Sequence, residues 1–145
     1  MVKAHIDISK GLDGEAVVLA CFDLDDAHLA ASAHAVAAAA AERYRTATLS
    51  TDDVLELREL TALADELADL ALRPGMRTVV LRPARLTAYR DAVAYFLESR
   101  DAAEWVREED REPLALARGL VYGLEELAAD ALHAALTGQP APRPC

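Results

Sequence analysis

The sequence predicts a helix-dominated α+β fold, with about four to five helices and a small sheet of three to four short strands. Two strand-like segments open the chain, at 2–8 and 16–22. Longer stretches then carry apolar residues at three- and four-residue spacing, which is typical of amphipathic helices. The segment 51–72 would span about 33 Å as a helix, whereas a five-residue strand spans about 17 Å. Helices that overhang their strands so far favour a small sheet over a doubly wound one.

Length and charge limit the classes of function. A chain of 145 residues predicts one globular domain, over 1–138, followed by a disordered proline-rich tail over 139–145. The formal net charge of −10 repels phosphate backbones and anionic lipids, so we expect neither nucleic acid nor a membrane as a partner. The two cysteines, Cys21 and Cys145, make no disulfide framework, which favours the cytoplasm. No motif predicts a cofactor.

The first part of the chain predicts a β-hairpin and a helix. Apolar and polar residues alternate from Val2 to Ile8, turn residues follow, and a nearly all-apolar strand covers Ala16–Phe22. Asp25 is a candidate N-cap, because its carboxylate can accept from the free N–H groups of a first helical turn. The predicted helix covers Asp26 to about Tyr44 and is mostly alanine in its middle.

A weak internal repeat, with an offset of about 32 residues, predicts two further strand–helix units. The strands are Arg45–Leu49 and Arg77–Leu81. The first is followed by a helix over Thr51–Leu72 with Ser50 as its cap, and the second by a helix that opens at Pro83. The buried face of this second helix is predicted to consist of Leu86, Tyr89, Val93, Phe96 and Leu97.

The last part of the chain predicts two more helices around a run of charged residues. Asp101 is expected to cap a short helix that Trp105 and Val106 anchor, and the charged run 107–112 is expected to be a solvated turn. Pro113 then opens a helix that reaches about Leu136, and Gly138 stops it. The buried stripe of this helix is predicted to include Leu116, Leu120, Leu124, Leu127, Ala131 and Ala135.

The segment Ala16–Asp26 is an apolar strand that ends in Asp23-Leu24-Asp25. It resembles the nucleophile motif of the haloacid-dehalogenase phosphotransferases over about eleven residues. The resemblance implies that Asp23 attacks phosphorus, that Asp25 acts as the acid/base and that both meet a magnesium ion. Ala27 stands where that family has Thr or Val, and no matching lysine or Gly-Asp motif follows. We therefore expect Asp25 to cap a helix and Asp23 to be solvated.

Three other patterns suggest sites. The equivalent repeat positions Arg58 and Arg90 could bind an anion together, although surface pairs with nearby carboxylates are the commoner role. Gly119 and Gly123 lie four apart on a predicted helix, which would let another helix approach closely, within the chain or across a dimer. The histidines form no closely spaced set with cysteine, so no dedicated zinc site is predicted, although His5 could approach Asp23 if the strands pair.

These observations leave three functions open. The leading hypothesis is a non-enzymatic interaction or regulatory module that acts as a homodimer, because the chain carries stripes suited to helix contacts and a sheet edge that needs cover. The alternative is a small-molecule-binding helical domain or small enzyme. Its apolar pocket would lie between the alanine-rich helix and the helix that carries Tyr89, Tyr95 and Phe96. A third hypothesis, an acidic mimic of nucleic acid, rests on charge alone.

Overall fold

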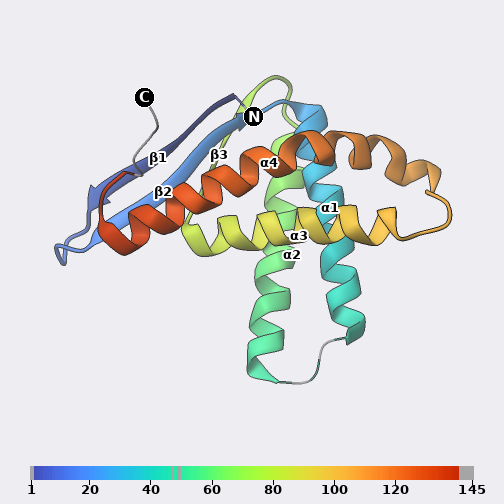
Figure 1. Ribbon diagram of the computed structural model, residues 1–145, viewed down its shortest axis with the longest axis horizontal. Helices are drawn as coiled ribbons and strands as arrows, with labels where there is room; N and C mark the ends of the chain where they lie inside the picture. The colour runs from blue at the N-terminus through green and yellow to red at the C-terminus, as the bar shows by residue number, and fades with distance from the viewer. Residues whose placement is uncertain (1, 47, 49, 141–145) are drawn as a thin grey trace.

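The fold is a three-stranded antiparallel sheet combined with four helices, in a computed structural model that describes residues 2–46, 48 and 50–140 (Figure 1). The helix-dominated α+β class predicted from the sequence is therefore confirmed. The elements follow in the order β1 (Val2–Lys10), β2 (Ala16–Leu24), α1 (Asp26–Thr46), α2 (Thr51–Ala71), β3 (Arg77–Leu81), α3 (Pro83–Asp101) and α4 (Glu108–Thr137).

The sheet has the strand order β1-β2-β3, with β2 in the centre. The predicted hairpin forms β1 and β2, and Gly14 takes a left-handed φ of 82° in its turn, which suits a residue without Cβ. One face of β2 is buried through Val18, Ala20, Phe22 and Leu24. Helix α4 contacts β1 and β2 and runs along the sheet (Figure 1).

Helix α1 lies at the centre of the helical part and contacts α2, α3 and α4. Its buried positions are mostly alanine, and these small side chains allow the neighbouring helices to approach. Helices α1 and α2 form an antiparallel pair that extends past α3, and α3 crosses this pair (Figure 1). The five residues predicted to form the buried face of α3 are all buried.

Four predicted helix ends are confirmed by their local contacts. The N–H of His28 donates to Asp25 Oδ1 at 2.8 Å, so Asp25 caps α1. Ser50 Oγ accepts from the N–H of Asp53 and caps α2. Pro83 opens α3, and Gly138 closes α4 with a left-handed φ of 70°.

The strand predicted over Arg45–Leu49 does not form in its described part. Helix α1 continues through Thr46, whose hydroxyl donates back to the carbonyl of Arg43, and residue 48 has no regular structure. Residues 47 and 49 lie outside the described part. Arg43 and Arg45 in the last turn favour this longer helix because cations are stabilised at a helix C-terminus. The predicted repeat of strand–helix units is therefore not confirmed.

The structure also corrects the region around residues 101–113. Asp101 ends α3 and caps no short helix, while Trp105 is exposed and anchors nothing among the described residues. Helix α4 begins at Glu108, so Pro113 lies inside it, and much of the predicted solvated turn is its first turn. Acidic side chains at a helix N-terminus are stabilised by the helix dipole, which explains the earlier start.

Two sequence predictions concern the last helix and the end of the chain. In the buried stripe of α4, Leu116 is only partly buried and Ala135 is exposed, while Leu114 and Ala134 are buried instead. The tail predicted over 139–145 falls mostly outside the described residues, and the domain boundary at 138 stays a prediction. No helix among the described residues combines the length and apolar character that crossing a bilayer requires.

Candidate functional site

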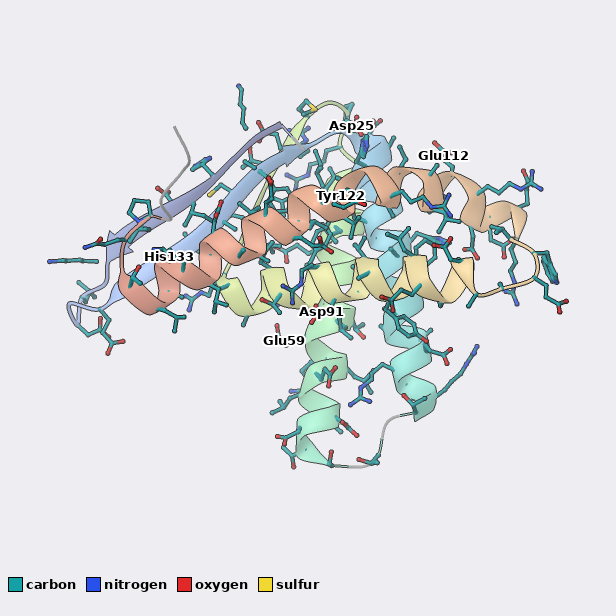
Figure 2. The ribbon with its side chains drawn as sticks, viewed as in Figure 1. Asp25, Glu59, Asp91, Glu112, Tyr122 and His133 are labelled. Carbon is teal, nitrogen blue, oxygen red and sulfur yellow. The ribbon has the colours of Figure 1, made fainter. Side chains whose placement is uncertain are left out.

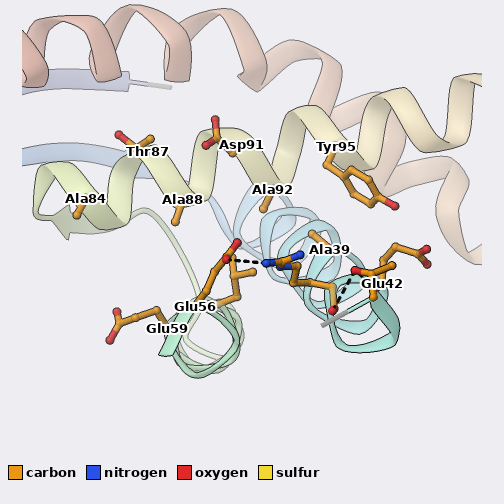
Figure 3. Close-up of a pocket in the computed structure, with 13 residues that line it drawn as sticks. Ala39, Glu42, Glu56, Glu59, Ala84, Thr87, Ala88, Asp91, Ala92 and Tyr95 are labelled. Carbon is orange, nitrogen blue, oxygen red and sulfur yellow. Dashed lines mark hydrogen bonds and ion pairs between the residues drawn. The ribbon is translucent and has the colours of Figure 1, made fainter. Parts of the chain in front are cut away.

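A hollow with a volume of about 630 Å³ lies between α1, α2 and α3; we call it the α1–α3 hollow (Figure 3). It occurs where α3 crosses the α1–α2 pair. Its lining residues are Ala39, Glu42, Arg43 and Thr46 of α1, Glu56, Glu59 and Leu60 of α2, and Ala84, Thr87, Ala88, Asp91, Ala92 and Tyr95 of α3. The size is in the range of small-molecule sites, which are about 300–1,000 Å³.

The hollow exists because α3 presents small side chains towards α1 and α2. Ala84, Ala88 and Ala92 recur every four residues, so they share one face of the helix, and Figure 3 shows them directed towards the other two helices. Larger side chains at these positions would fill the space. Together with Ala39 and Leu60, these alanines give the hollow an apolar floor.

Acidic side chains surround this floor. Glu42, Glu56, Glu59 and Asp91 line the hollow together with Arg43, and three further arginines, Arg45, Arg85 and Arg90, pair with Glu42, Glu59 and Asp91. Figure 2 shows Glu59 and Asp91 where α2 and α3 cross. The formal charge of the whole chain is −10, so the electrostatic potential around the molecule is negative.

Ion pairs hold the walls of the hollow in place. Arg43 contacts Asp53 at 2.5 Å and Glu56 at 3.2 Å, which joins α1 to α2. Arg85 contacts Glu59 at 2.9 Å and so joins α3 to α2. Hydrogen bonds from Thr48, followed by the Arg43 charge, lower the pKa of Asp53 despite its desolvation. The Asp53 carboxylate therefore stays ionised at neutral pH.

A buried ionic cluster lies between α1, α3 and α4. The Asp110 carboxylate is 3% exposed and accepts from His34 Nε2 at 2.7 Å and from Arg100 Nε at 2.8 Å. The Arg100 guanidinium also lies 4.9 Å from the centre of the Phe96 ring. The nearby Ser99 hydroxyl donates to the Phe96 carbonyl, so it is not activated as a nucleophile. The cluster joins α1, α3 and α4.

The helical core contains one buried polar pair that the sequence analysis did not identify. Ser32 of α1 and Tyr89 of α3 are both fully buried, and their hydroxyls form a hydrogen bond. Burial raises the pKa of Tyr89, and the bond to Ser32 only partly opposes this. The Tyr89 phenol therefore stays protonated inside the core, where it hydrogen-bonds to Ser32 and has no access to a substrate.

Asp23 and Asp25, the two carboxylates of the predicted phosphotransferase-like motif, lie at the end of β2. Each accepts hydrogen bonds from neighbouring residues. Asp23 accepts a hydrogen bond from the Thr78 hydroxyl of β3 at 2.6 Å. Asp25 accepts from the N–H and from Nδ1 of His28, and these bonds lower its pKa. Asp25 therefore acts as a helix cap, and the metal role that the resemblance implies stays a prediction for both residues.

The predicted anion site is not assembled by the described contacts. Arg90 pairs with the adjacent Asp91 at 2.9 Å, at the rim of the hollow. Arg58 is exposed on α2. The anion role of these two arginines therefore stays a prediction.

The two glycines predicted for helix packing lie within α4. Gly119 is exposed, and a Cβ at this position would meet no described atom within 4 Å. Gly123 is partly buried one turn further along. A close helix contact at this pair stays a prediction, and at Gly119 the open space leaves room for a second chain.

One group of three metal-ligating side chains occurs among the described residues, and it lies on the sheet and not in the hollow. It consists of His5 and Asp7 of β1 and Cys21 of β2. Burial, and then the Asp7 charge, raise the pKa of the Cys21 thiol, which makes it a poor nucleophile at neutral pH. The sequence analysis missed this group because strand pairing brings together residues far apart in the chain.

Comparisons with protein-family models, with curated proteins and with solved structures found no match for this chain. The functional argument therefore rests on the geometry and chemistry of its own residues.

Proposed function

We propose that the protein is a non-enzymatic binding module of the cytoplasm, and that the α1–α3 hollow binds a small organic cation with an apolar body. One observation carries this proposal: an alanine-rich floor lies among four carboxylates, each of them ion-paired with an arginine, in a chain whose formal net charge is −10. The acidic rim attracts a cation, and the floor removes its apolar part from water. Of the functions that the sequence left open, this geometry favours the small-molecule alternative.

The size of the hollow supports a small ligand over a partner helix. A volume of about 630 Å³ suits a compact molecule. An amphipathic helix needs a groove that accepts side chains along several turns. The cationic end of the ligand would meet the exposed carboxylates of Glu59 and Asp91 beside their partners Arg85 and Arg90, while Ala88 and Ala92 would contact its body.

The test compares two probes that differ in charge, 2-phenylethylamine and its neutral counterpart 2-phenylethanol, added to the isotope-labelled full chain. The amine should shift backbone amide signals of α1, α2 and α3 around the hollow, and the alcohol should do so more weakly. The double variant Glu59→Gln/Asp91→Asn should weaken binding of the amine but not of the alcohol. Glu125→Gln, which removes an exposed charge from α4, is the matched control.

A variant with a filled hollow separates this site from general charge attraction. Ala88→Leu should abolish the amine-induced shifts and leave the rest of the spectrum unchanged. The proposal fails if the amine perturbs only amides outside the hollow, or if Glu125→Gln weakens binding as much as the double variant does.

A homodimer is the second candidate function, and the outer edge of β1, which pairs with no other strand among the described residues, favours it. β1 is an edge strand of nine residues, and an edge of this length offers unpaired N–H and C=O groups to a second copy. Pairing of two such edges would extend the sheet across the dimer. Light scattering at increasing concentration should then show a dimer, and hydrogen exchange of β1 amides should slow as it forms. A monomer at the highest soluble concentration would refute it.

A further inference from the structure

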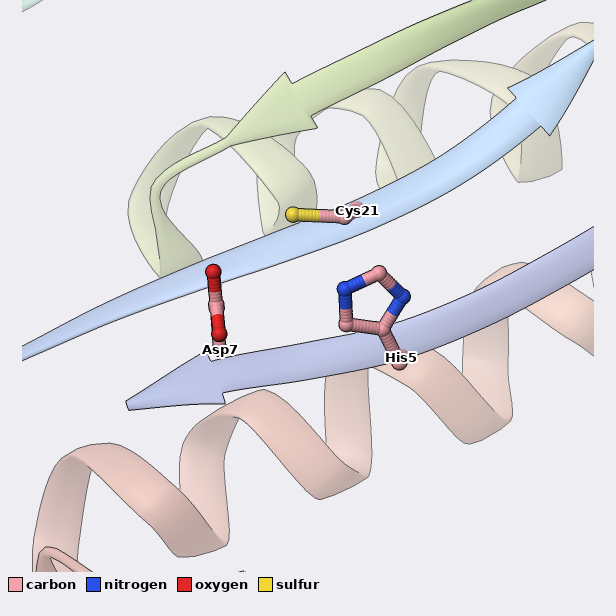
Figure 4. A group of neighbouring side chains, drawn as sticks. All are labelled: His5, Asp7 and Cys21. Atoms are coloured by element: carbon pink, nitrogen blue, oxygen red, sulfur yellow. The ribbon is translucent and has the colours of Figure 1, made fainter. Parts of the chain in front are cut away.

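We propose that His5, Asp7 and Cys21 form a zinc site on the outer face of the sheet. Their ligand atoms all lie within 4.8 Å of one another (Figure 4). An imidazole, a carboxylate and a thiolate are three ligand types that zinc accepts. The site is separate from the α1–α3 hollow and does not depend on the function proposed for it.

The register of the hairpin brings these residues together. His5 pairs with Cys21 across the two strands, and Asp7 lies two residues further along β1, on the same face as His5. The inward face of β2 consists of other residues, such as Ala20 and Phe22, so the three side chains share the outer face. Figure 4 shows all three on one side of the strands, with Asp7 and His5 flanking the space next to Cys21.

Local backbone structure orients the imidazole of His5. The register shifts between Val2 and His5, and Lys3 there takes a left-handed φ of 55°, which is uncommon for a residue other than glycine. The Lys3 carbonyl lies 3.2 Å from His5 Nδ1. If Nδ1 carries the proton, it donates to this carbonyl and leaves the Nε2 lone pair for a metal. A hydrogen bond from the second ring nitrogen to a backbone carbonyl is the usual support of a metal-bound histidine.

Only small movements are needed to close the site around an ion. Tetrahedral zinc places its ligand atoms about 3.3–3.7 Å apart. His5 and Asp7 are exposed and can rotate, while Cys21 is 8% exposed and held by the sheet. Sulfur and nitrogen ligands favour zinc over magnesium or calcium, which prefer oxygen throughout. With three protein ligands, water fills the fourth position.

The test uses the full chain with Cys145→Ser, so that Cys21 is the single thiol. After treatment with a chelator, its removal and the addition of Zn²⁺ followed by buffer exchange, native mass spectrometry should show one Zn²⁺ retained per chain. Co²⁺ serves as the optical probe, because sulfur coordination gives a charge-transfer band and tetrahedral geometry gives strong visible bands. Zinc should also raise the melting temperature, since it binds the folded chain.

Each ligand is then removed in turn. His5→Ala, Asp7→Asn and Cys21→Ser should each weaken zinc binding at least about tenfold, and Cys21→Ser should also abolish the charge-transfer band. His133→Ala and Ser9→Ala are matched controls and should bind like the parent chain. Circular dichroism checks that the variants fold, and His5→Ala changes only an exposed side chain. The proposal is overturned if the parent chain retains no zinc, or if His5→Ala binds it unchanged.

Discussion

Asp110 on α4 accepts a hydrogen bond from Nε2 of His34 on α1 at 2.7 Å, although 76 residues separate the two in the sequence. Arg100 of α3 binds the second oxygen of the same carboxylate. A buried carboxylate lowers stability unless partners compensate for its lost hydration, and here both partners come from other helices. The ionised form of Asp110 therefore links three helices at one point.

Replacing Asp110 should reveal a pH-dependent contribution to stability. Burial raises the pKa of this carboxyl, but the bonds from His34 and Arg100 and their charges outweigh it, so the pKa lies below its ordinary value. The unfolded chain then binds this proton more readily than the folded one. The contribution is present above about pH 4 and is lost as the pH falls through the lower folded-state pKa.

Urea unfolding of Asp110→Asn should show a loss of about 1–3 kcal/mol near neutral pH. The difference from the parent chain should shrink as the solution is acidified below about pH 4. Asp69→Asn, at an exposed position of α2, is the control and should change stability little at any pH. A difference that stayed constant down to acidic pH would contradict a role for the ionised carboxylate.

The buried pair of Ser32 and Tyr89 predicts strong coupling between two substitutions. Tyr89→Phe leaves the Ser32 hydroxyl without its partner, which should cost about 1–2 kcal/mol of unfolding free energy. Ser32→Ala leaves the buried Tyr89 hydroxyl without its hydrogen-bond partner in the same way. The double variant should lose clearly less than the two single losses added together, because no unpaired group remains. Additive losses in a denaturant-based cycle would show that the hydroxyls do not stabilise each other.

Gly119→Ala should stabilise the isolated chain. The position is exposed within α4 and has room for a Cβ, so the higher helix propensity of alanine should add about 0.5–1 kcal/mol. Thermal unfolding of a dilute sample measures this gain. The same variant examines the predicted helix contact: a gain in a monomer but a weaker dimer at high concentration would indicate that Gly119 lies between two chains.

Gly138→Ala should have the opposite effect. Gly138 has a left-handed φ of 70°, and the nearest atom to an added Cβ is 3.9 Å away, so the penalty comes from the backbone and not from a clash. A loss of about 1 kcal/mol is expected. Asn tolerates this conformation better than Ala, so Gly138→Asn should lose less. Equal losses for the two variants would mean that the backbone changes its conformation at this position.

Local patterns in the sequence were enough to predict most elements. The alternation in β1, the apolar run of β2, the cap at Ser50 and the stop at Gly138 each depend on neighbouring residues, and these predictions are confirmed. The strand at Arg45–Leu49 failed because its composition also suits the end of a helix. The repeat that suggested it compares residue types alone, and in the described part of the segment α1 continues through Thr46 instead.

The binding features were harder to predict because they depend on contacts between distant segments. Asp110 belongs to a run of charged residues that appears solvated until His34 and Arg100 are brought against it. Likewise, the α1–α3 hollow forms only because α3 crosses the α1–α2 pair. The spacing of apolar residues along each helix does not predict this crossing. The sequence did indicate an alanine-rich helix and Tyr95 as parts of a pocket, and both line the hollow.

Helix α2 packs mainly against α1 and has a smaller contact with α3. A helix with one principal neighbour can detach at a lower free energy than the whole chain needs to unfold. Because α2 forms one wall of the hollow, its detachment would open that wall while β1, β2 and α4 stay packed. A ligand bound against that wall would oppose the detachment, so it would slow amide exchange along α2.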